Sequence, residues 1–259
     1  MDFTLEELSM DGWPALMTLL YDGWVIRLSN GYGNRSNSIN PIYSSKINME
    51  EKIEYCKKLF GRHNLPAAYK LLSCEEHKPL EKRLEALKYR KINETSVQTC
   101  NIPATTESKR RGIIVSEGFD EHWIKSVIEF NQIEEKDVPT FKKILGNIAR
   151  EKIVVRKEVA GEIAGCGYGV IGNGYVGVFD ITVKEDQRRK GYGREIVETI
   201  LREAAKRGVK NSYLQVMLNN PAALRLYKKL GFREKYQYWY RKKPEEILSN
   251  PQRFHHGNS

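Results

Sequence analysis

Residues 187–194 read Gln187-Arg188-Arg189-Lys190-Gly191-Tyr192-Gly193-Arg194, a basic turn spaced by glycines. The turn follows a strand-like run over 178–183 and opens a helix-like run over 193–206. Glycine lets a backbone approach a ligand closely, successive N–H groups can point at phosphate oxygens, and a helix N-terminus adds partial positive charge. The turn therefore predicts a pyrophosphate site, although an exposed basic turn between a strand and a helix would look the same.

A second informative stretch lies downstream and predicts a short helix. It reads Asn220-Pro221-Ala222-Ala223-Leu224-Arg225-Leu226-Tyr227-Lys228-Lys229-Leu230-Gly231-Phe232. Asn220 has the side chain of an N-cap, Pro221 suits the first helical position, and Gly231 closes the helix.

The two stretches together resemble the GCN5-related N-acetyltransferase (GNAT) family. The acetyl-CoA turn of that family, Arg/Gln-x-x-Gly-x-Gly/Ala, is matched at Arg188, Gly191 and Gly193. The resemblance covers roughly residues 112–243, about half of the chain, and says much less about the first 105 residues. The later helix of the family, Asn-x-x-Ala-x-x-Leu-Tyr-x-x-x-Gly-Phe, is matched without a gap at Asn220, Ala223, Leu226, Tyr227, Gly231 and Phe232.

The resemblance implies an α/β (α+β) fold with a mixed sheet, the GNAT acyl-CoA transferase fold, in the second half of the chain. It also implies an N-acetyltransferase that passes the acetyl group of its co-substrate acetyl-CoA to a primary amine by direct attack, without a metal. An alternative is a non-catalytic module that binds acyl-CoA as a sensor or scaffold. The residues that the resemblance places at the donor are Ile181, Val183, Arg188, Arg189, Lys190, Gly191, Tyr192, Gly193, Arg194, Asn220, Ala223 and Tyr227.

Tyr227 is the candidate catalytic residue. A tyrosine with a pKa near 10 is protonated at neutral pH and can give its proton to a departing thiolate. In the family, the tyrosine at this helix position has that role. A tyrosine on an apolar helix face is also commonly a core residue, so both interpretations stay open.

The base that takes the proton of the amine is not identified. In a regular strand over 178–183, alternation places Asp180 on the face opposite Phe179 and Ile181. An unpaired carboxylate there would face the cleft or solvent, which makes Asp180 one candidate. A chain of water molecules is another possibility. The weaker side-chain candidates are Glu117 and Glu162.

Composition favours a folded protein of one large or two ordinary domains. The chain has 259 residues, 40% of them hydrophobic, and 9 prolines. No apolar run approaches the length of a membrane span, and Met1-Asp2-Phe3-Thr4 does not start a signal region, so we expect a cytoplasmic protein and no membrane partner. The four cysteines are scattered and form no CxxC pair, which favours buried free thiols over structural zinc.

The net charge of +10 comes with three short basic clusters, at 109–111, 188–190 and 241–243. The phosphates of CoA would explain the second cluster, and we expect the other two to be solvated linker and tail. No nucleic-acid-binding signature accompanies them, so nucleic acid is an unlikely partner. The expected partners are acetyl-CoA and an amine-bearing acceptor. Neither the acceptor nor the oligomeric state is specified by the sequence.

Hydrophobic periodicity gives the second half the order β-α-α-β-β-β-α-β-α-β, the order expected of a GNAT domain. Gly172-Asn173-Gly174 is a strong hairpin turn within this region. The strands are expected at 112–116, 152–158, 163–171, 175–183, 213–218 and 232–241, and the helices at 120–130, 138–149, 193–206 and 221–230.

The first half is less clear. Thr4 and Glu7 suggest a capping box for a first helix. A strand is then expected at 24–28 and a loop or hairpin at 31–38. A helix at 49–60, a strand at 67–72, a helix at 79–88 and a strand at 91–102 complete a strand-helix-strand-helix-strand order. This order matches the second half of a GNAT domain. Resemblance to the N-terminal portion of some two-part bacterial GNAT proteins rests on Trp24, Arg27, Gly31, Tyr32, Arg35, Asn37 and Ser38.

We therefore expect an N-terminal α/β domain over 1–105, a GNAT domain over 112–243 and a C-terminal tail over 244–259. The boundary falls in the polar stretch 101–111, which contains Pro103. The first domain would be a degenerate GNAT-like copy, because no Arg-x-x-Gly-x-Gly turn precedes the helix at 49–60.

Overall fold

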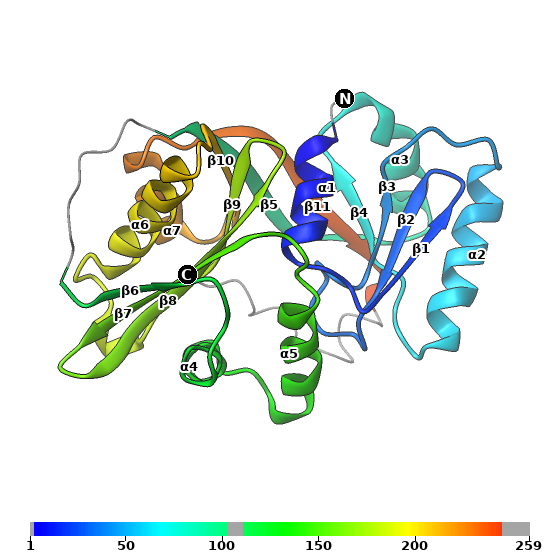
Figure 1. Ribbon diagram of the computed structural model, residues 1–259. Coiled ribbons are helices and arrows are strands. Elements are labelled where there is room, and N and C mark those ends of the chain that lie inside the picture. Colours follow the sequence, from blue (N-terminus) through cyan, green and yellow to red (C-terminus); the bar gives the residue numbers. More distant parts are fainter. Residues whose placement is uncertain (1–2, 103–110, 245–259) are drawn as a thin grey trace.

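The computed structural model of the chain describes residues 3–102 and 111–244 (Figure 1). The second half follows the predicted element order, and the helix expected at 138–149 ends at Gly146. Its elements are β6 (Ile113–Ser116), α4 (Glu121–Phe130), α5 (Val138–Gly146), β7 (Lys152–Val159), β8 (Glu162–Gly172), β9 (Tyr175–Val183), α6 (Tyr192–Lys206), β10 (Asn211–Met217), α7 (Pro221–Lys229) and β11 (Arg233–Lys242), with short 3₁₀ turns at Glu135–Asp137 and Glu185–Gln187.

The first half confirms the predicted strands and helices and adds two strands. β1 pairs with β2 through a tight turn at Asp22 and Gly23, and β3 follows the expected loop or hairpin at 31–38 and pairs with β2 as well. The capping box is wrong, because Thr4 is the first helical residue and Phe3 takes the N-cap position without a side-chain hydrogen bond. The elements are α1 (Thr4–Gly12), β1 (Met17–Tyr21), β2 (Trp24–Leu28), β3 (Ser38–Pro41), α2 (Met49–Arg62), β4 (Tyr69–Leu72), a 3₁₀ turn (Glu75–His77), α3 (Lys78–Ala86) and β5 (Arg90–Asn101).

The strands of the described residues form one mixed sheet, in the order β1-β2-β3-β4-β11-β5-β10-β9-β8-β7-β6. Two runs of the chain share one element order, because β1-β2-β3-α2-β4-α3-β5 corresponds to β7-β8-β9-α6-β10-α7-β11. Each run gives its last strand to the other run. β5 pairs with β10, and β11 pairs with β4.

This exchange joins the two halves across the expected boundary at 101–111. The boundary itself lies mostly outside the described residues, as does nearly all of the expected tail over 244–259. β5 and β11 also pair with each other along most of their length. In Figure 1, α6 and α7 lie at one end of the sheet and α2 and α3 at the other, with α1 between them.

A buried ion pair fastens β11 to the first half of the chain. The Arg241 guanidinium donates from Nε to the Glu81 carboxylate of α3 at 3.0 Å and from Nη1 to the Tyr89 carbonyl at 3.0 Å. Arg241 is 8% exposed and Lys242 is 5% exposed. The expectation of a solvated basic tail at 241–243 is therefore wrong for these two residues, which continue the last strand of the sheet.

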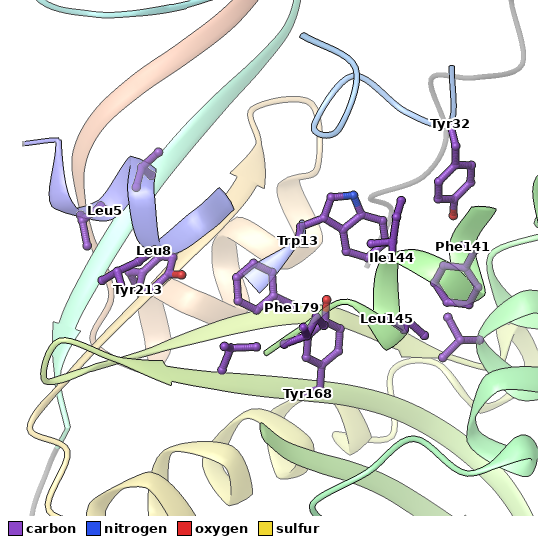
Figure 2. Packing of buried hydrophobic residues seen from close by; sticks show 14 of the residues in the cluster. Leu5, Leu8, Trp13, Tyr32, Phe141, Ile144, Leu145, Tyr168, Phe179 and Tyr213 are labelled. Atoms are coloured by element: carbon purple, nitrogen blue, oxygen red, sulfur yellow. The ribbon is translucent and has the colours of Figure 1, made fainter. Parts of the chain in front are cut away.

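The largest core cluster lies under α1, α4 and α5. Figure 2 shows Leu5 and Leu8 of α1, and Trp13 directly after it, in a cluster that also contains Tyr168 and Phe179 of the sheet. Burying a side chain of this size contributes about 1.5–3 kcal/mol to stability. Because α1 contacts β8 and β9, the first helix of the chain belongs to the core of the second half.

Two further clusters cover the ends of the sheet. One joins α6 and α7 to β7–β10, and the other joins α2 and α3 to β2, β3 and β4. The apolar face of α6 is the predicted one, and Gly208 ends that helix region with φ of +79°. Its buried residues include Ile196, Val197, Ile200, Leu201 and Ala204.

Cys56, Cys100 and Cys166 are buried free thiols, as predicted, and Cys74 is half-buried and also free. Within residues 3–102 and 111–244, no helix is both long and apolar enough to cross a membrane.

Candidate active site

The sheet opens between β9 and β10. These two strands pair in parallel only from Tyr175 to Val178 on one side and from Asn211 to Leu214 on the other. β9 then runs on to Val183, while β10 continues beside β5. Strands that part in this way leave backbone groups of β9 available to an extended ligand.

A bulge in β9 lies at this opening. The register against β8 shifts between Cys166 and Tyr168, and Asp180 has φ of +44°, a left-handed conformation uncommon outside glycine. As a result, Phe179 packs in the cluster of α1, α4 and α5, whereas Ile181 packs in the cluster of α6 and α7. The prediction that Phe179 and Ile181 share one face is wrong, because it assumed a strand without a bulge.

The predicted pyrophosphate turn lies at the N-terminus of α6. Gly191 is the N-cap with φ of +88°, and no side chain caps this helix end. The first amide groups of α6 are therefore left for a ligand, at the positive end of the helix dipole. A Cβ at Gly193 would lie 3.7 Å from Leu226 and 3.8 Å from Ile181, so any longer side chain would extend into the space beside them.

This turn and α7 line an open groove of about 610 Å³. None of the lining residues is acidic, and Arg188, Arg189, Arg194, Arg225 and Lys229 give it five positive charges. Such a lining attracts a polyanion. The residues predicted at the donor that line the groove are Ile181, Val183, Arg188, Arg189, Gly191, Tyr192, Gly193, Arg194, Asn220 and Ala223.

The remaining predicted residues lie elsewhere. Lys190 is not among the lining residues, and its ammonium donates to the Gln187 side chain at 2.9 Å. Tyr227 lines a second, adjoining cavity. Arg225 and Lys229 were missed, although Arg225 follows Ala222 by three positions and Lys229 follows Arg225 by four, which places all three on one face of α7.

Asn220 holds the start of α7, as predicted. Its side chain accepts a hydrogen bond from the Ala223 N–H at 3.0 Å, and Pro221 occupies the first helical position. At the other end, Gly231 has φ of +92°. This local geometry places Tyr227 on the inner face of α7, 5% exposed and edge-on to Phe232.

The second cavity has a volume of about 60 Å³ and adjoins the groove at Ile181, which lines both. Its walls come from six parts of the chain: the C-cap of α1, the loop after β2, the α4–α5 region, β9, β10 and α7. The lining residues are Trp13, Tyr32, Arg35, Asn131, Ile133, Phe141, Val178, Phe179, Asp180, Ile181, Tyr213, Gln215 and Tyr227.

The Tyr227 hydroxyl keeps its proton in this environment. Burial raises the pKa of Tyr227 well above its usual value, and the negative charge of Asp180 raises it further. A neutral hydroxyl at the edge of a cavity can donate a proton, so the position suits a general acid as well as a core residue.

Asp180 is paired, contrary to the sequence-based expectation of an unpaired carboxylate. Its Oδ1 accepts a hydrogen bond from Arg35 Nη2 at 3.1 Å. The Arg35 guanidinium also lies over the Trp13 ring, 4.3 Å from its centroid. Periodicity could not find this contact, because 145 positions separate the two partners.

The loop that carries Tyr32 and Arg35 is held from inside by Asn37. The Asn37 side chain accepts from the Ser29 N–H at 2.7 Å and donates to the Tyr32 and Gly33 carbonyls at 3.0 and 2.8 Å. Beneath the loop, the buried Arg27 donates to the backbone carbonyls of Trp13 and Arg35. Burial lowers the pKa of Arg27 to about 10, so it stays charged at neutral pH.

Known proteins were compared with this chain. The sequence profile of the family described as "Probable histone acetyltransferase Rv0428c C-terminal" matches residues 3–241. The chain belongs to this family of GNAT acetyltransferases. A relative along nearly the whole chain is "Uncharacterized N-acetyltransferase YobR" of Bacillus subtilis, which is 25% identical over 242 residues, covering 92% of this GNAT chain and 96% of YobR.

Other relatives match a smaller part of this GNAT chain. Ribosomal protein bS18-alanine N-acetyltransferase of Escherichia coli is 44% identical over 57 residues, 22% of the chain and 38% of that protein.

Two solved structures share the fold. A GCN5-related N-acetyltransferase from Kribbella flavida has a TM-score of 0.66 at 14% identity and covers 94% of this chain and 95% of its own.

The second structure, from Sphaerobacter thermophilus, has a TM-score of 0.59 at 16% identity, with 93% of this chain and 85% of that chain covered. Both matches span nearly the whole chain, so the mixed α/β fold predicted for a GNAT protein is confirmed. The prediction of an acyltransferase of the N-acetyltransferase type is also confirmed.

Proposed function

We propose that the chain transfers the acetyl group of acetyl-CoA to a small primary amine. The observation that carries this proposal is that the basic groove and the second cavity share Ile181 as a lining residue. The basic groove extends from the α6 turn to Ile181, and the smaller cavity is also lined by Ile181. The thioester would lie at this junction, with the amine in the cavity and Tyr227 beside both.

The residues of the groove fit CoA. The α6 amides would bind the pyrophosphate, and the five cationic side chains of the groove would bind its negative charge and that of the 3′-phosphate. The pantetheine arm would follow the parted strand of β9 from Val183 to Ile181. Asn220 would have a double role, as the cap of α7 and as a contact of the donor.

The reaction would run by direct attack. The neutral amine nitrogen bonds to the thioester carbonyl carbon, and the C–S bond then breaks with its electron pair on sulfur. Tyr227 gives its proton to that sulfur, the nitrogen loses a proton to solvent, and the tyrosinate then regains a proton from solvent. Starting from an ammonium, the overall reaction yields an amide, free CoA and one proton.

The first half would be a degenerate copy of the GNAT domain that has lost its donor site. The place equivalent to the α6 turn lies between β3 and α2. There, the Asp22 carboxylate accepts from the N–H groups of Lys46 and Ile47 at 2.9 and 2.8 Å. The Asn48 side chain caps α2 by accepting from the Glu50 N–H at 2.8 Å. Side chains of the protein itself thus hold the amides that a phosphate would need.

The names of the family and of one relative suggest protein acceptors, namely histones and an alanine of ribosomal protein bS18. A cavity of about 60 Å³ favours a much smaller amine or the end of a thin chain.

Release of free CoA, measured over a panel of amines with acetyl-CoA as donor, tests the proposal. We expect CoA release that depends on the amine and an acceptor that gains one acetyl group by mass spectrometry. CoA release with no acetylated product from any amine would contradict it.

A further inference from the structure

We infer that the acceptor of this GNAT enzyme is a small free α-amino acid, whose carboxylate binds Arg35 while its amine lies at Asp180. The inference rests on the proposed function and narrows its substrate class. It begins from the Arg35–Asp180 pair, which brings one positive and one negative group together in the wall of a small cavity.

Both members of the pair keep unused hydrogen-bonding groups. Arg35 has five N–H donors, and within residues 3–102 and 111–244 its guanidinium donates only to Asp180. Asp180 accepts only at Oδ1, so its Oδ2 is unused. None of these unused atoms is among the buried unpaired polar atoms of the described residues. The side chains are 25% and 11% exposed, so the unused atoms can reach a ligand.

The charges of an α-amino acid match this arrangement. One carbon separates its amine from its carboxylate, so its two charges lie side by side, as those of Arg35 and Asp180 do. A guanidinium binds a carboxylate through two parallel hydrogen bonds, and a carboxylate binds an ammonium. A simple amine would satisfy Asp180 and leave the donors of Arg35 without an acceptor.

The size of the cavity limits the acceptor. A water-sized group needs about 10–15 Å³ on the same measure, so a cavity of about 60 Å³ holds about four to six such groups. Glycine, alanine and serine have about that many heavy atoms. Trp13, Tyr32 and Phe141 line the cavity and pack against one another, with ring centroids 6.2–6.3 Å apart, so a long side chain would have to displace them.

The site is preorganised by the first half of the chain. Asn37 and the buried Arg27 fix the backbone of the loop that carries Arg35, and the Asn30 side chain donates to Thr140 of α5 at 3.1 Å. The degenerate half would therefore supply Arg35, which binds the carboxylate, while the second half supplies Asp180 for the amine and binds the donor.

The transfer follows the chemistry of the proposed function. The amino acid nitrogen, once neutral, bonds to the acetyl carbon, the C–S bond breaks, and Tyr227 protonates the sulfur. The products are an N-acetyl amino acid and free CoA, with one proton released from the ammonium form. Asp180 and Arg35 exchange no electrons or protons in this scheme and act by binding.

The test compares glycine, alanine and serine with glycinamide, alaninamide and ethylamine, each assayed by CoA release. We expect kcat/KM for the amino acids to exceed that for the amides and for ethylamine by about 10- to 100-fold, the value of a charge-assisted contact. Equal or better turnover of alaninamide would overturn the inference and favour a peptide N-terminus. Equal turnover of ethylamine would overturn it as well.

Variants of Arg35 and Asp180 test whether these two residues produce the preference for amino acids. Arg35→Met should raise KM for alanine by about 10- to 100-fold more than it changes KM for ethylamine, while Arg35→Lys should restore part of the preference. The double variant Arg35→Met/Asp180→Asn removes both charges and leaves no unpaired carboxylate if the single variant folds poorly. A preference for alanine that survives without Arg35 would contradict the inference.

Calorimetry separates this inference from the proposed function. With the CoA-loaded full chain, alanine should bind more tightly than alaninamide, and Arg35→Met should abolish the difference. If alanine binds in this way but no amine is acetylated, the proposed function fails and the binding site stands. If acetylation occurs without any selective binding of alanine, the inference fails and the proposed function stands.

Discussion

Arg35, from the loop after β2, forms an ion pair with Asp180, at the bulge of β9, with 3.1 Å between Nη2 and Oδ1. Desolvation is the largest single influence on the guanidinium and lowers the pKa of Arg35. The charge and hydrogen bond of Asp180, together with the nearby Tyr168 and Tyr238, outweigh it, so the pKa is raised overall. The pair joins the two halves of the chain at the cavity beside Tyr227. It explains why the first half, which lacks the donor turn, is nevertheless part of the enzyme.

A donor site in the basic groove predicts that substitution of Gly193 strongly lowers the affinity for acetyl-CoA. Gly193→Glu would place a carboxylate beside the α6 amides, and like charges at a binding surface cost several kcal/mol. We therefore expect acetyl-CoA affinity to fall on the order of 100-fold or more. Arg189→Ala should only weaken binding, because four other cations line the groove.

Gly61→Glu is the matched control, since Gly61 lies in a helix and a Cβ there meets open space. It should bind acetyl-CoA as the unchanged chain does. Unchanged acetyl-CoA affinity in a folded Gly193→Glu variant, measured by calorimetry, would contradict the placement of the pyrophosphate at this turn.

The occupied turn before α2 predicts one donor site per chain. Because Asp22 accepts from the amides of Lys46 and Ile47, we expect calorimetry to show one equivalent of acetyl-CoA bound. The contacts to Ser45, Ile47 and Lys46 also hold the pKa of Asp22 well below its usual value, so the carboxylate stays charged at any pH of interest. A stoichiometry of two would show a donor site in the first half.

Stability should fall in mild acid because of His77, which is 5% exposed. Its Nδ1 accepts from the Leu72 N–H at 2.8 Å, so Nε2 carries the proton and donates to the Pro41 carbonyl at 2.6 Å. Burial lowers the pKa of His77. As pH falls below about 6.5, the unfolded chain binds a proton that the folded chain resists, so the free energy of unfolding decreases.

The slope from this one group is at most about 1.4 kcal/mol per pH unit. His77→Gln keeps a donor and an acceptor without titrating and should remove that part of the slope, whereas His63→Gln, on an exposed residue, should not. Denaturant titrations from pH 5 to 7.5 give the comparison. Parallel pH profiles for the unchanged chain and His77→Gln would show that His77 does not contribute.

The sequence predicted the features that depend on residues close together in the chain, such as helix caps and the apolar face of a helix. The caps Asn220 and Gly231 and the apolar face of α6 lie within single elements, so spacing along the sequence revealed them. The bulge at Asp180 was missed because alternation assumes a regular strand, and it reversed the faces of neighbouring residues. The contact with Arg35 was missed because only the assembled sheet brings these positions together.

The exchange of β5 and β11 was also beyond a local pattern. Both strands were predicted, but their neighbours are set by pairing between distant parts of the chain. Arg241 illustrates the consequence. A basic residue near the end of the described chain suggested solvated tail, yet its partner Glu81 lies 160 positions earlier and buries it in the sheet.

Tyr227→Phe tests the central claim most directly, because it removes one hydroxyl and keeps the ring in the core. General acid catalysis supplies about 10²–10⁴-fold in rate. With an accepted amine, we predict that turnover falls by about that factor or somewhat less, since thiolate is a moderately good leaving group, while acetyl-CoA affinity and the thermal midpoint change little. Turnover near that of the unchanged enzyme would contradict the account and would show that Tyr227 is only a core residue.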